Sequence, residues 1–128
     1  MAALSSMLKE YGLVAKLDVR DLKVSLEFYV QKLGLTNDLR WQVPDVWAQV
    51  YYPNNPRAWI GLNKTAQPVT NQGSTITFLV RDIKEARARL QAEGIEVSEI
   101  EEAPGDVLLC FFQDPDQNSL GLRQDPRA

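Results

Sequence analysis

The residues best suited to hold an organic molecule recur at every second position of three strand-like segments. The three sets are Trp47, Gln49 and Tyr51; Trp59, Gly61 and Asn63; and Ser119, Gly121 and Arg123. Alternate residues of a strand point to one face of its sheet. With Lys16, Asp18, Thr75 and Thr77 they would supply cations, hydroxyls, an amide and aromatic rings. Such a mixture suits a planar or amphipathic molecule that bears an acceptor or anionic group.

Ten of these positions are our predicted ligand-binding residues: Lys16, Trp47, Tyr51, Trp59, Gly61, Asn63, Thr75, Thr77, Gly121 and Arg123. Structural interpretations compete with this one. Trp47 and Trp59 would equally serve in a core or a dimer interface, and Lys16 would equally pair with Asp18. A glycine inside a strand would equally mark a bulge or a tight twist.

Histidine is absent, and the one cysteine, Cys110, lies in the apolar run 107–112. The commonest metal ligand and the commonest general base at neutral pH are therefore missing. A catalytic cysteine usually needs a neighbouring base, so we expect Cys110 to be a buried small hydrophobe. We predict no cofactor and name no catalytic residue. A chain without an internal disulfide also suits the reducing cytoplasm.

The elements that must position these residues follow one order twice. Residues 12–19 alternate as a strand, Asp21 is a good N-cap, and apolar residues then recur at helical spacing over residues 21–33 up to Gly34. Three strands are expected next, at 38–43, 47–52 and 58–63. After a polar linker, 64–73, the order restarts with a strand at 75–80, a helix capped by Asp82, and strands at 95–100, 107–112 and 119–123. Residues 1–11 are expected to be a tail or a short helix.

Three matches at spacings of 60 or 61 residues indicate that the order is a duplication. Asp21 precedes Asp82 by 61 residues, and Leu33-Gly34 precedes Glu93-Gly94 by 60. The tetrapeptide WIGL (59–62) precedes SLGL (119–122), also by 60. We therefore predict an α+β fold in a single domain, residues 1–128. Two tandem βαβββ modules, 12–63 and 74–124, would form a curved mixed sheet that encloses a cleft, with the helices outside.

Two segments resemble a known superfamily. Residues 19–35, VRDLKVSLEFYVQKLGL, resemble the strand-to-helix signature of the vicinal oxygen chelate superfamily, which includes glyoxalases, bleomycin resistance proteins and extradiol dioxygenases. Residues 111–118, FFQDPDQN, are similar to its closing F-x-D-P-D-G-N turn, with Gln117 where the family usually has glycine. The resemblance covers about residues 12–124 and implies the paired βαβββ fold.

The positions that hold metal in the superfamily's enzymes carry unsuitable residues here. The resemblance places one ligand seven residues before each helix-capping Asp and one on the last strand of each module. These positions are Val14, Thr75, Gly61 and Gly121. Valine and glycine side chains cannot bind a cation, so we predict no metal and no Lewis-acid chemistry. The two glycines would instead enlarge the cleft or let a ligand touch the backbone.

The favoured function is a metal-independent small-molecule binding protein of the glyoxalase/bleomycin-resistance type. It would sequester an aromatic or amphipathic compound such as an antibiotic, and the resemblance implies a homodimer. The alternative is a metal-free isomerase, lyase or cyclase acting on a small oxo or hydroxy compound. A degenerate module with a structural or protein-interaction role also stays open.

The bulk properties limit other partners. The net charge of −3 and the pI near 4.9 argue against nucleic acid, which needs clustered Lys and Arg. No apolar run reaches the roughly 20 residues of a membrane span. We therefore expect a cytoplasmic protein with a small organic ligand and no membrane partner.

Overall fold

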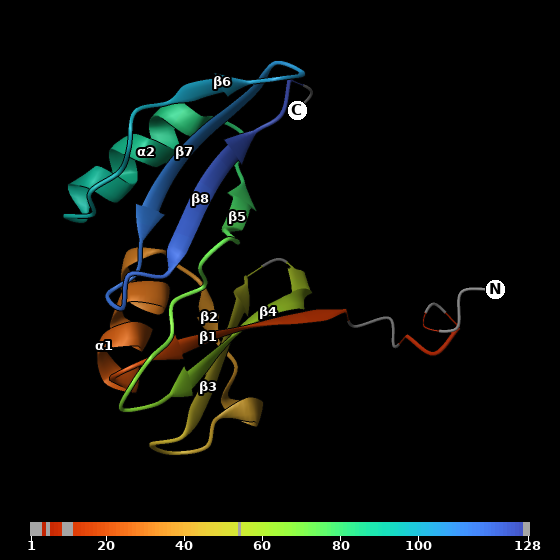
Figure 1. Cartoon of the computed structure of the whole chain (residues 1–128), viewed down its shortest axis with the longest axis vertical. Helices are drawn as coiled ribbons and strands as arrows, with labels where there is room; N and C mark the ends of the chain where they lie inside the picture. Colours follow the sequence, from red (N-terminus) through yellow and green to blue (C-terminus); the bar gives the residue numbers. More distant parts are fainter. Residues whose placement is uncertain (1–3, 5, 9–11, 54, 127–128) are drawn as a thin grey trace. The chain divides into compact units, whose positions relative to one another are not determined.

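A computed structural model describes residues 4, 6–8, 12–53 and 55–126 of the 128-residue chain. The chain divides into two compact units, residues 1–66 and 67–128. Each unit has a four-stranded mixed sheet and a helical segment. The α+β class and the two tandem βαβββ modules are therefore confirmed, and each sheet is open (Figure 1). The common cleft stays a prediction.

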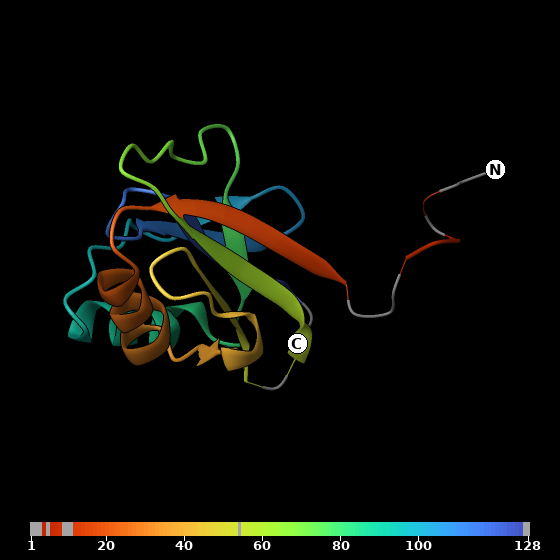
Figure 2. The same ribbon diagram turned by 90° about the horizontal axis from the view of Figure 1, so that it is seen from below.

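Unit 1 contains β1 (Leu13–Val19), α1 (Leu22–Leu26), the π-helix η1 (Glu27–Lys32), β2 (Thr36–Asn37), the 3-10 helix η2 (Leu39–Trp41), β3 (Trp47–Tyr52) and β4 (Asn55–Lys64). Its strand order is β1-β4-β3-β2. Strands β1 and β4 are parallel, and the other neighbours are antiparallel. In Figure 2, β1 and β4 run side by side with the α1–η1 helix on one side of their sheet.

Local chemistry explains the helix of unit 1. The Asp21 carboxylate accepts hydrogen bonds from the backbone N–H groups of Lys23 and Val24, at 2.9 and 3.2 Å, which caps the first turn. Phe28 and Tyr29 are buried, and their rings contact each other edge to face. The sheet's helix-facing core is made of Leu17, Val19, Ala48, Val50, Ile60 and Leu62. The alternate residues of the same strands consequently point to the other face.

One turn of this helix is wider than an α-helical turn. The Leu33 N–H donates to the Phe28 carbonyl, five residues back, at 3.0 Å. In the helix of unit 2, the Glu93 N–H donates to Arg89, four residues back, at 3.2 Å. The first helix thus ends in a π-turn where the second stays α-helical.

Unit 2 contains β5 (Ile76–Leu79), α2 (Ile83–Ala92), β6 (Glu101–Ala103), β7 (Val107–Gln113) and β8 (Ser119–Gln124). Its strand order, β5-β8-β7-β6, repeats that of unit 1 position by position. Cys110 is buried with Phe112, Leu120 and Leu122 in its core, as the sequence suggested. Burial raises the pKa of the Cys110 thiol.

Two expected strands are wrong. Residues 38–43 form η2 and irregular chain, because the Asp38 carboxylate caps that 3-10 turn and only Thr36–Asn37 pairs with β3. Residues 95–100 lie before β6, which begins at Glu101. There the Arg87 guanidinium binds the carbonyls of Val97 and Ser98, and the Ser98 hydroxyl accepts the Phe111 N–H. Side chains thus take backbone groups that a strand ladder would use.

Gln117, at the position where the resembling superfamily usually has glycine, adopts a backbone conformation that glycine favours. Gln117 has φ +67°, in the left-handed region that favours glycine. The buried Asp114 carboxylate accepts from the N–H groups of Asp116 and Asn118, which holds the turn. The strained residue is therefore fixed by its neighbours.

No helix among the described residues is long and apolar enough to cross a membrane. The expected tail or short helix at residues 1–11 lies largely outside the described residues.

Candidate functional site

The face of sheet 1 opposite its helix brings six of the ten predicted residues together. Strand register arranges this face in three rows. The middle row runs Lys16, Gly61, Gln49, Asp38. One flanking row runs Val14, Trp59, Tyr51, Thr36, and the other runs Asp18, Asn63, Trp47. We call these eleven residues the unit 1 face.

A buried carboxylate organises one edge of the unit 1 face. Asp38 is only 4 % exposed. Its oxygens accept two hydrogen bonds from the Arg40 side chain, Nε at 2.8 Å and Nη2 at 2.7 Å, and one from Trp59 Nε1 at 3.1 Å. The Arg40 hydrogen bonds, with Trp59 adding to them, overcome burial and lower the pKa of Asp38 to about 2. Asp38 is therefore a fixed anion that holds one cation and one aromatic ring.

The opposite edge has a second carboxylate-held cation. Lys16 Nζ lies 3.1 Å from Asp18 Oδ1, and the Asn63 side chain donates to the same oxygen at 3.1 Å. Between the two edges, Trp47 Nε1 donates to Gln49 Oε1 at 2.9 Å. Most polar groups of the unit 1 face are thus held by neighbouring side chains, which limits their rearrangement when a ligand binds.

Each in-strand glycine lies beneath an aromatic ring of its own unit. A Cβ added to Gly61 would overlap ring carbons Cζ2 and Cη2 of Trp47. A Cβ added to Gly121 would come within 3.3 Å of Phe111 Cδ1. The space beside both glycines is accordingly filled by a ring of the chain itself. In this conformation the two glycines therefore do not add open space to a cleft, because Trp47 and Phe111 occupy the space beside them.

The equivalent face of sheet 2 holds the other four predicted residues. Thr77 is the register partner of Gly121, and Leu79 that of Arg123. Thr75 Oγ1 and Ser119 Oγ lie 2.9 Å apart. Arg123 binds Asp125 through Nε. This unit 2 face consists of Thr75, Thr77, Leu79, Ser98, Leu109, Phe111, Gln113, Ser119, Gly121 and Arg123.

The residues at the superfamily's metal positions do not fit a metal. Val14 and Gly61 in unit 1, and Thr75 and Gly121 in unit 2, offer one hydroxyl and no carboxylate, imidazole or thiolate. The rings of Trp47 and Phe111 stand where a longer side chain at either glycine would extend. Among the described residues, no group of three or more His, Cys, Asp or Glu side chains could hold a metal ion.

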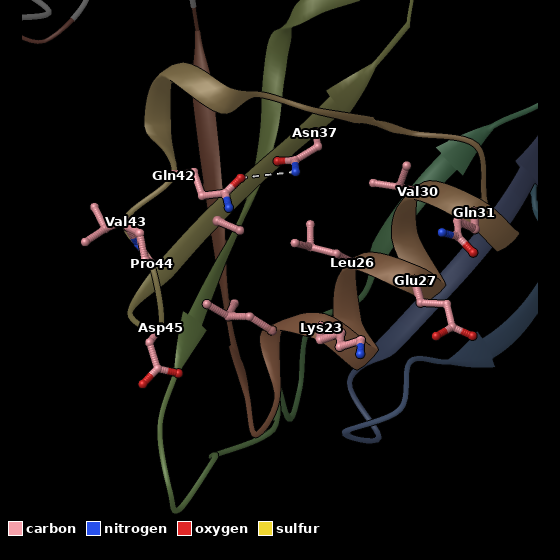
Figure 3. Close-up of a pocket in the computed structure, with 12 residues that line it drawn as sticks. Lys23, Leu26, Glu27, Val30, Gln31, Asn37, Gln42, Val43, Pro44 and Asp45 are labelled. Atoms are coloured by element: carbon pink, nitrogen blue, oxygen red, sulfur yellow. Dashed lines mark hydrogen bonds between the residues drawn. The ribbon is translucent and has the colours of Figure 1, made fainter.

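A hollow that the sequence did not predict lies on the helix side of sheet 1. Its volume is about 490 Å³, and none of the ten predicted residues lines it. In Figure 3 Leu26 of the helix points toward Gln42 of the chain before β3, and the Asn37 side chain donates to Gln42. Lys23, Glu27 and Asp45 also line the hollow. A second hollow, of about 380 Å³, is polar and includes Thr75 and Ser119 of unit 2.

Sequence reasoning missed the two residues that organise one edge of the unit 1 face. Asp38 and Arg40 were assigned to a strand, in which their side chains would merely share a face. The available signal was the spacing of an Asp two residues before an Arg, since Asp is also a good cap for a short turn. The Asp38 carboxylate links Arg40 to the predicted Trp59, because both side chains donate hydrogen bonds to it.

Comparison with known proteins decides the family. A family model described as "Glyoxalase/Bleomycin resistance protein/Dioxygenase superfamily" matches residues 13–122. The chain belongs to this superfamily. No curated protein matches this superfamily member.

Solved structures agree with the family. A Sphaerobacter thermophilus member of the superfamily is 25 % identical, with TM-score 0.75, and the match covers 93 % of this chain and 99 % of that one. TnmS3, described as an antibiotic binding protein from Streptomyces sp. CB03234, is 23 % identical, with TM-score 0.76 and coverage of 93 % and 98 %. A lactoylglutathione lyase from Agrobacterium tumefaciens is 19 % identical, with TM-score 0.70 and coverage of 88 % and 91 %. A binding protein and an enzyme thus share this fold, and the fold does not choose between them.

Proposed function

We propose that this superfamily member is a metal-independent binding protein that sequesters an aromatic or amphipathic small molecule, such as an antibiotic. The observation that carries the proposal is the unit 1 face, where Trp47, Trp59 and Tyr51 are half-buried and the two indoles donate to Gln49 and Asp38. Rings held in place stack on a planar ligand with little loss of conformational freedom. The structural likeness to an antibiotic binding protein supports the same class of function.

Chemistry at the metal positions supports binding over metal catalysis. Valine, threonine and two glycines cannot supply the charged ligands that Lewis-acid catalysis requires. The metal-free enzyme remains the alternative. Lys16 and Asp18, two of its candidate acid-base groups, pair with each other at 3.1 Å.

Tryptophan fluorescence tests the proposal. The variant Trp41→Phe leaves Trp47 and Trp59 as the only indoles, because the chain has three tryptophans. Titration with a panel of aromatic and peptide antibiotics, in a chelator-containing buffer, is expected to quench that fluorescence saturably and raise the unfolding temperature. Absence of both effects across the panel, or their dependence on added divalent metal, would contradict the proposal.

We further infer a homodimer located in the cytoplasm. Sedimentation equilibrium of the full chain tests the first point, with twice the 14.5 kDa chain mass as the expected result. Cell fractionation tests the second. A monomer at micromolar concentration, or recovery outside the cytoplasmic fraction, would overturn the corresponding inference.

A further inference from the structure

Two cations that pair with carboxylates of the unit 1 face, Arg40 and Lys16, are exposed, whereas those carboxylates are covered. The Arg40 side chain is 69 % exposed and its partner Asp38 only 3 %. The Lys16 side chain is 58 % exposed and its partner Asp18 only 12 %. A molecule that approaches this face therefore meets positive charge first, although the four charges sum to zero.

Arg40 keeps hydrogen-bonding capacity toward solvent. A guanidinium has five N–H donors, and Asp38 accepts two of them. The other three have no acceptor among the described residues. Asp38 binds the guanidinium through both Nε and Nη2, which fixes the orientation of its plane. The remaining N–H donors therefore point in a fixed direction and are suited to bind two oxygens of an acidic group on a ligand.

The register sets the backbone distance between Lys16 and Asp38, the residues at the two ends of the middle row. Lys16, Gly61, Gln49 and Asp38 lie in one row across β1, β4, β3 and the residue that follows β2. Three spacings between neighbouring strands amount to about 14 Å. Trp47 lies over Gly61 in the middle of this row, and Trp59 and Tyr51 flank it as register partners. An aromatic strip is thus bounded by a cation at either end.

We propose that the ligand of this face is an aromatic acid, or a flat aromatic molecule with an acidic or strongly accepting group, and that Arg40 recognises that group. This inference rests on the proposed binding function and narrows it to one ligand class. The ring system stacks on the indoles while Arg40 donates to the acidic group. A ligand with a second such group reaches toward Lys16. Arg40 is in this way a specificity-determining residue that the sequence did not suggest.

A pair of dyes with the same rings separates charge recognition from ring binding. The dye 1-anilinonaphthalene-8-sulfonate carries a sulfonate, and N-phenyl-1-naphthylamine lacks it. The wild-type chain is expected to bind the sulfonate at least tenfold more tightly. Arg40→Gln should weaken sulfonate binding about tenfold and change binding of the neutral dye less than twofold. Arg40→Lys keeps the charge but loses the planar guanidinium, so its affinity for the sulfonate dye should lie between those of the wild-type chain and Arg40→Gln.

Controls distinguish the possible failures. Arg89→Gln removes an exposed arginine that pairs with Glu85 at 2.8 Å in unit 2 and should leave both affinities unchanged. The midpoints of urea denaturation confirm that each variant is folded. If Arg40→Gln does not fold, the dye affinities of Arg40→Lys test the role of Arg40 instead. Equal losses for both dyes, or no loss for either, would overturn the role of Arg40 while leaving aromatic binding intact. Failure of both dyes to bind the wild-type chain would overturn the proposed function as well.

Discussion

The two modules have the same strand register, yet their non-helical faces differ in chemistry. Position by position, the unit 1 residues Trp47, Gln49, Tyr51, Trp59, Lys16 and Asp18 correspond to Leu109, Phe111, Gln113, Ser119, Thr77 and Leu79 of unit 2. Asp38 corresponds to Ser98, because their backbone N–H groups donate to Gln49 and Phe111 respectively. Only the glycines, Gly61 and Gly121, are common to both faces. The two modules thus share a scaffold, while the hydrogen-bonded aromatic groups are concentrated in the first module.

The glycines should give the largest difference between the two units. Gly61→Ala forces the Trp47 ring to move and is expected to destabilise the chain by about 2 to 3 kcal/mol. Gly121→Ala needs only a small shift of Phe111. Alanine also loses less conformational entropy on folding than glycine, which offsets the cost of that shift, so the free energy of unfolding should change by no more than about 0.5 kcal/mol. Urea denaturation of both variants measures the two values. Equal costs would show that the ring over Gly61 adapts freely.

The next largest effect concerns the carboxylate edge. Asp38→Asn removes the negative charge and one of the two acceptor oxygens that hold Arg40 and Trp59, and should cost about 1 to 2 kcal/mol at pH 7. The matched Ser98→Ala loses only one acceptor, for the Phe111 N–H, and should cost less.

The same carboxylate predicts a pH dependence. Arg40 lowers the pKa of Asp38 from 3.8 to about 2, so its stabilisation is present above about pH 4 and is lost as the pH falls toward 2. The stability difference between wild type and Asp38→Asn should shrink over that range in urea titrations. A difference that stays constant from pH 5 to pH 2 would contradict the ion pair.

A smaller effect, of opposite sign, is expected in the helices. Ser25 is fully buried, and no described residue hydrogen-bonds its hydroxyl. The equivalent residue in α2, four positions after the capping Asp, is Ala86. Ser25→Ala makes the first helix like the second and should raise stability by about 0.5 to 1 kcal/mol. A loss measured by thermal unfolding would mean that the hydroxyl has a partner in solution.

The smallest effects on stability belong to the exposed ion pairs. Lys16→Met and Arg123→Gln each remove a largely solvent-exposed cation from its ion pair and should alter stability by less than about 0.5 kcal/mol. Their effects on binding separate the two faces. Lys16→Met should weaken a ligand with two acidic groups, whereas Arg123→Gln should not if unit 1 carries the site. In titrations with an aromatic dye that carries two sulfonates, the opposite ranking would place the site in unit 2.

Periodicity was sufficient to predict the modules and the face on which each candidate lies. Alternation placed Trp47, Trp59 and Tyr51 together because strand residues have a fixed period. It failed at residues 38–43 and 95–100, where Asp38 and Arg87 bind the backbone and end the pairing. It also could not detect that Trp47 reaches diagonally over Gly61, since a rotamer has no signature in a strand pattern.

The wide turn at the end of the first helix accounts for an irregularity in the repeat. Gly34 follows its capping Asp21 by 13 residues, whereas Gly94 follows Asp82 by 12. The five-residue hydrogen bond from Leu33 to Phe28 absorbs the additional residue within the helix, so the following strands keep their places. Deleting the exposed Gln31 would therefore restore equal lengths in both copies without displacing the sheet. The π-turn is thus the place where the first helix accommodates one residue more than the second.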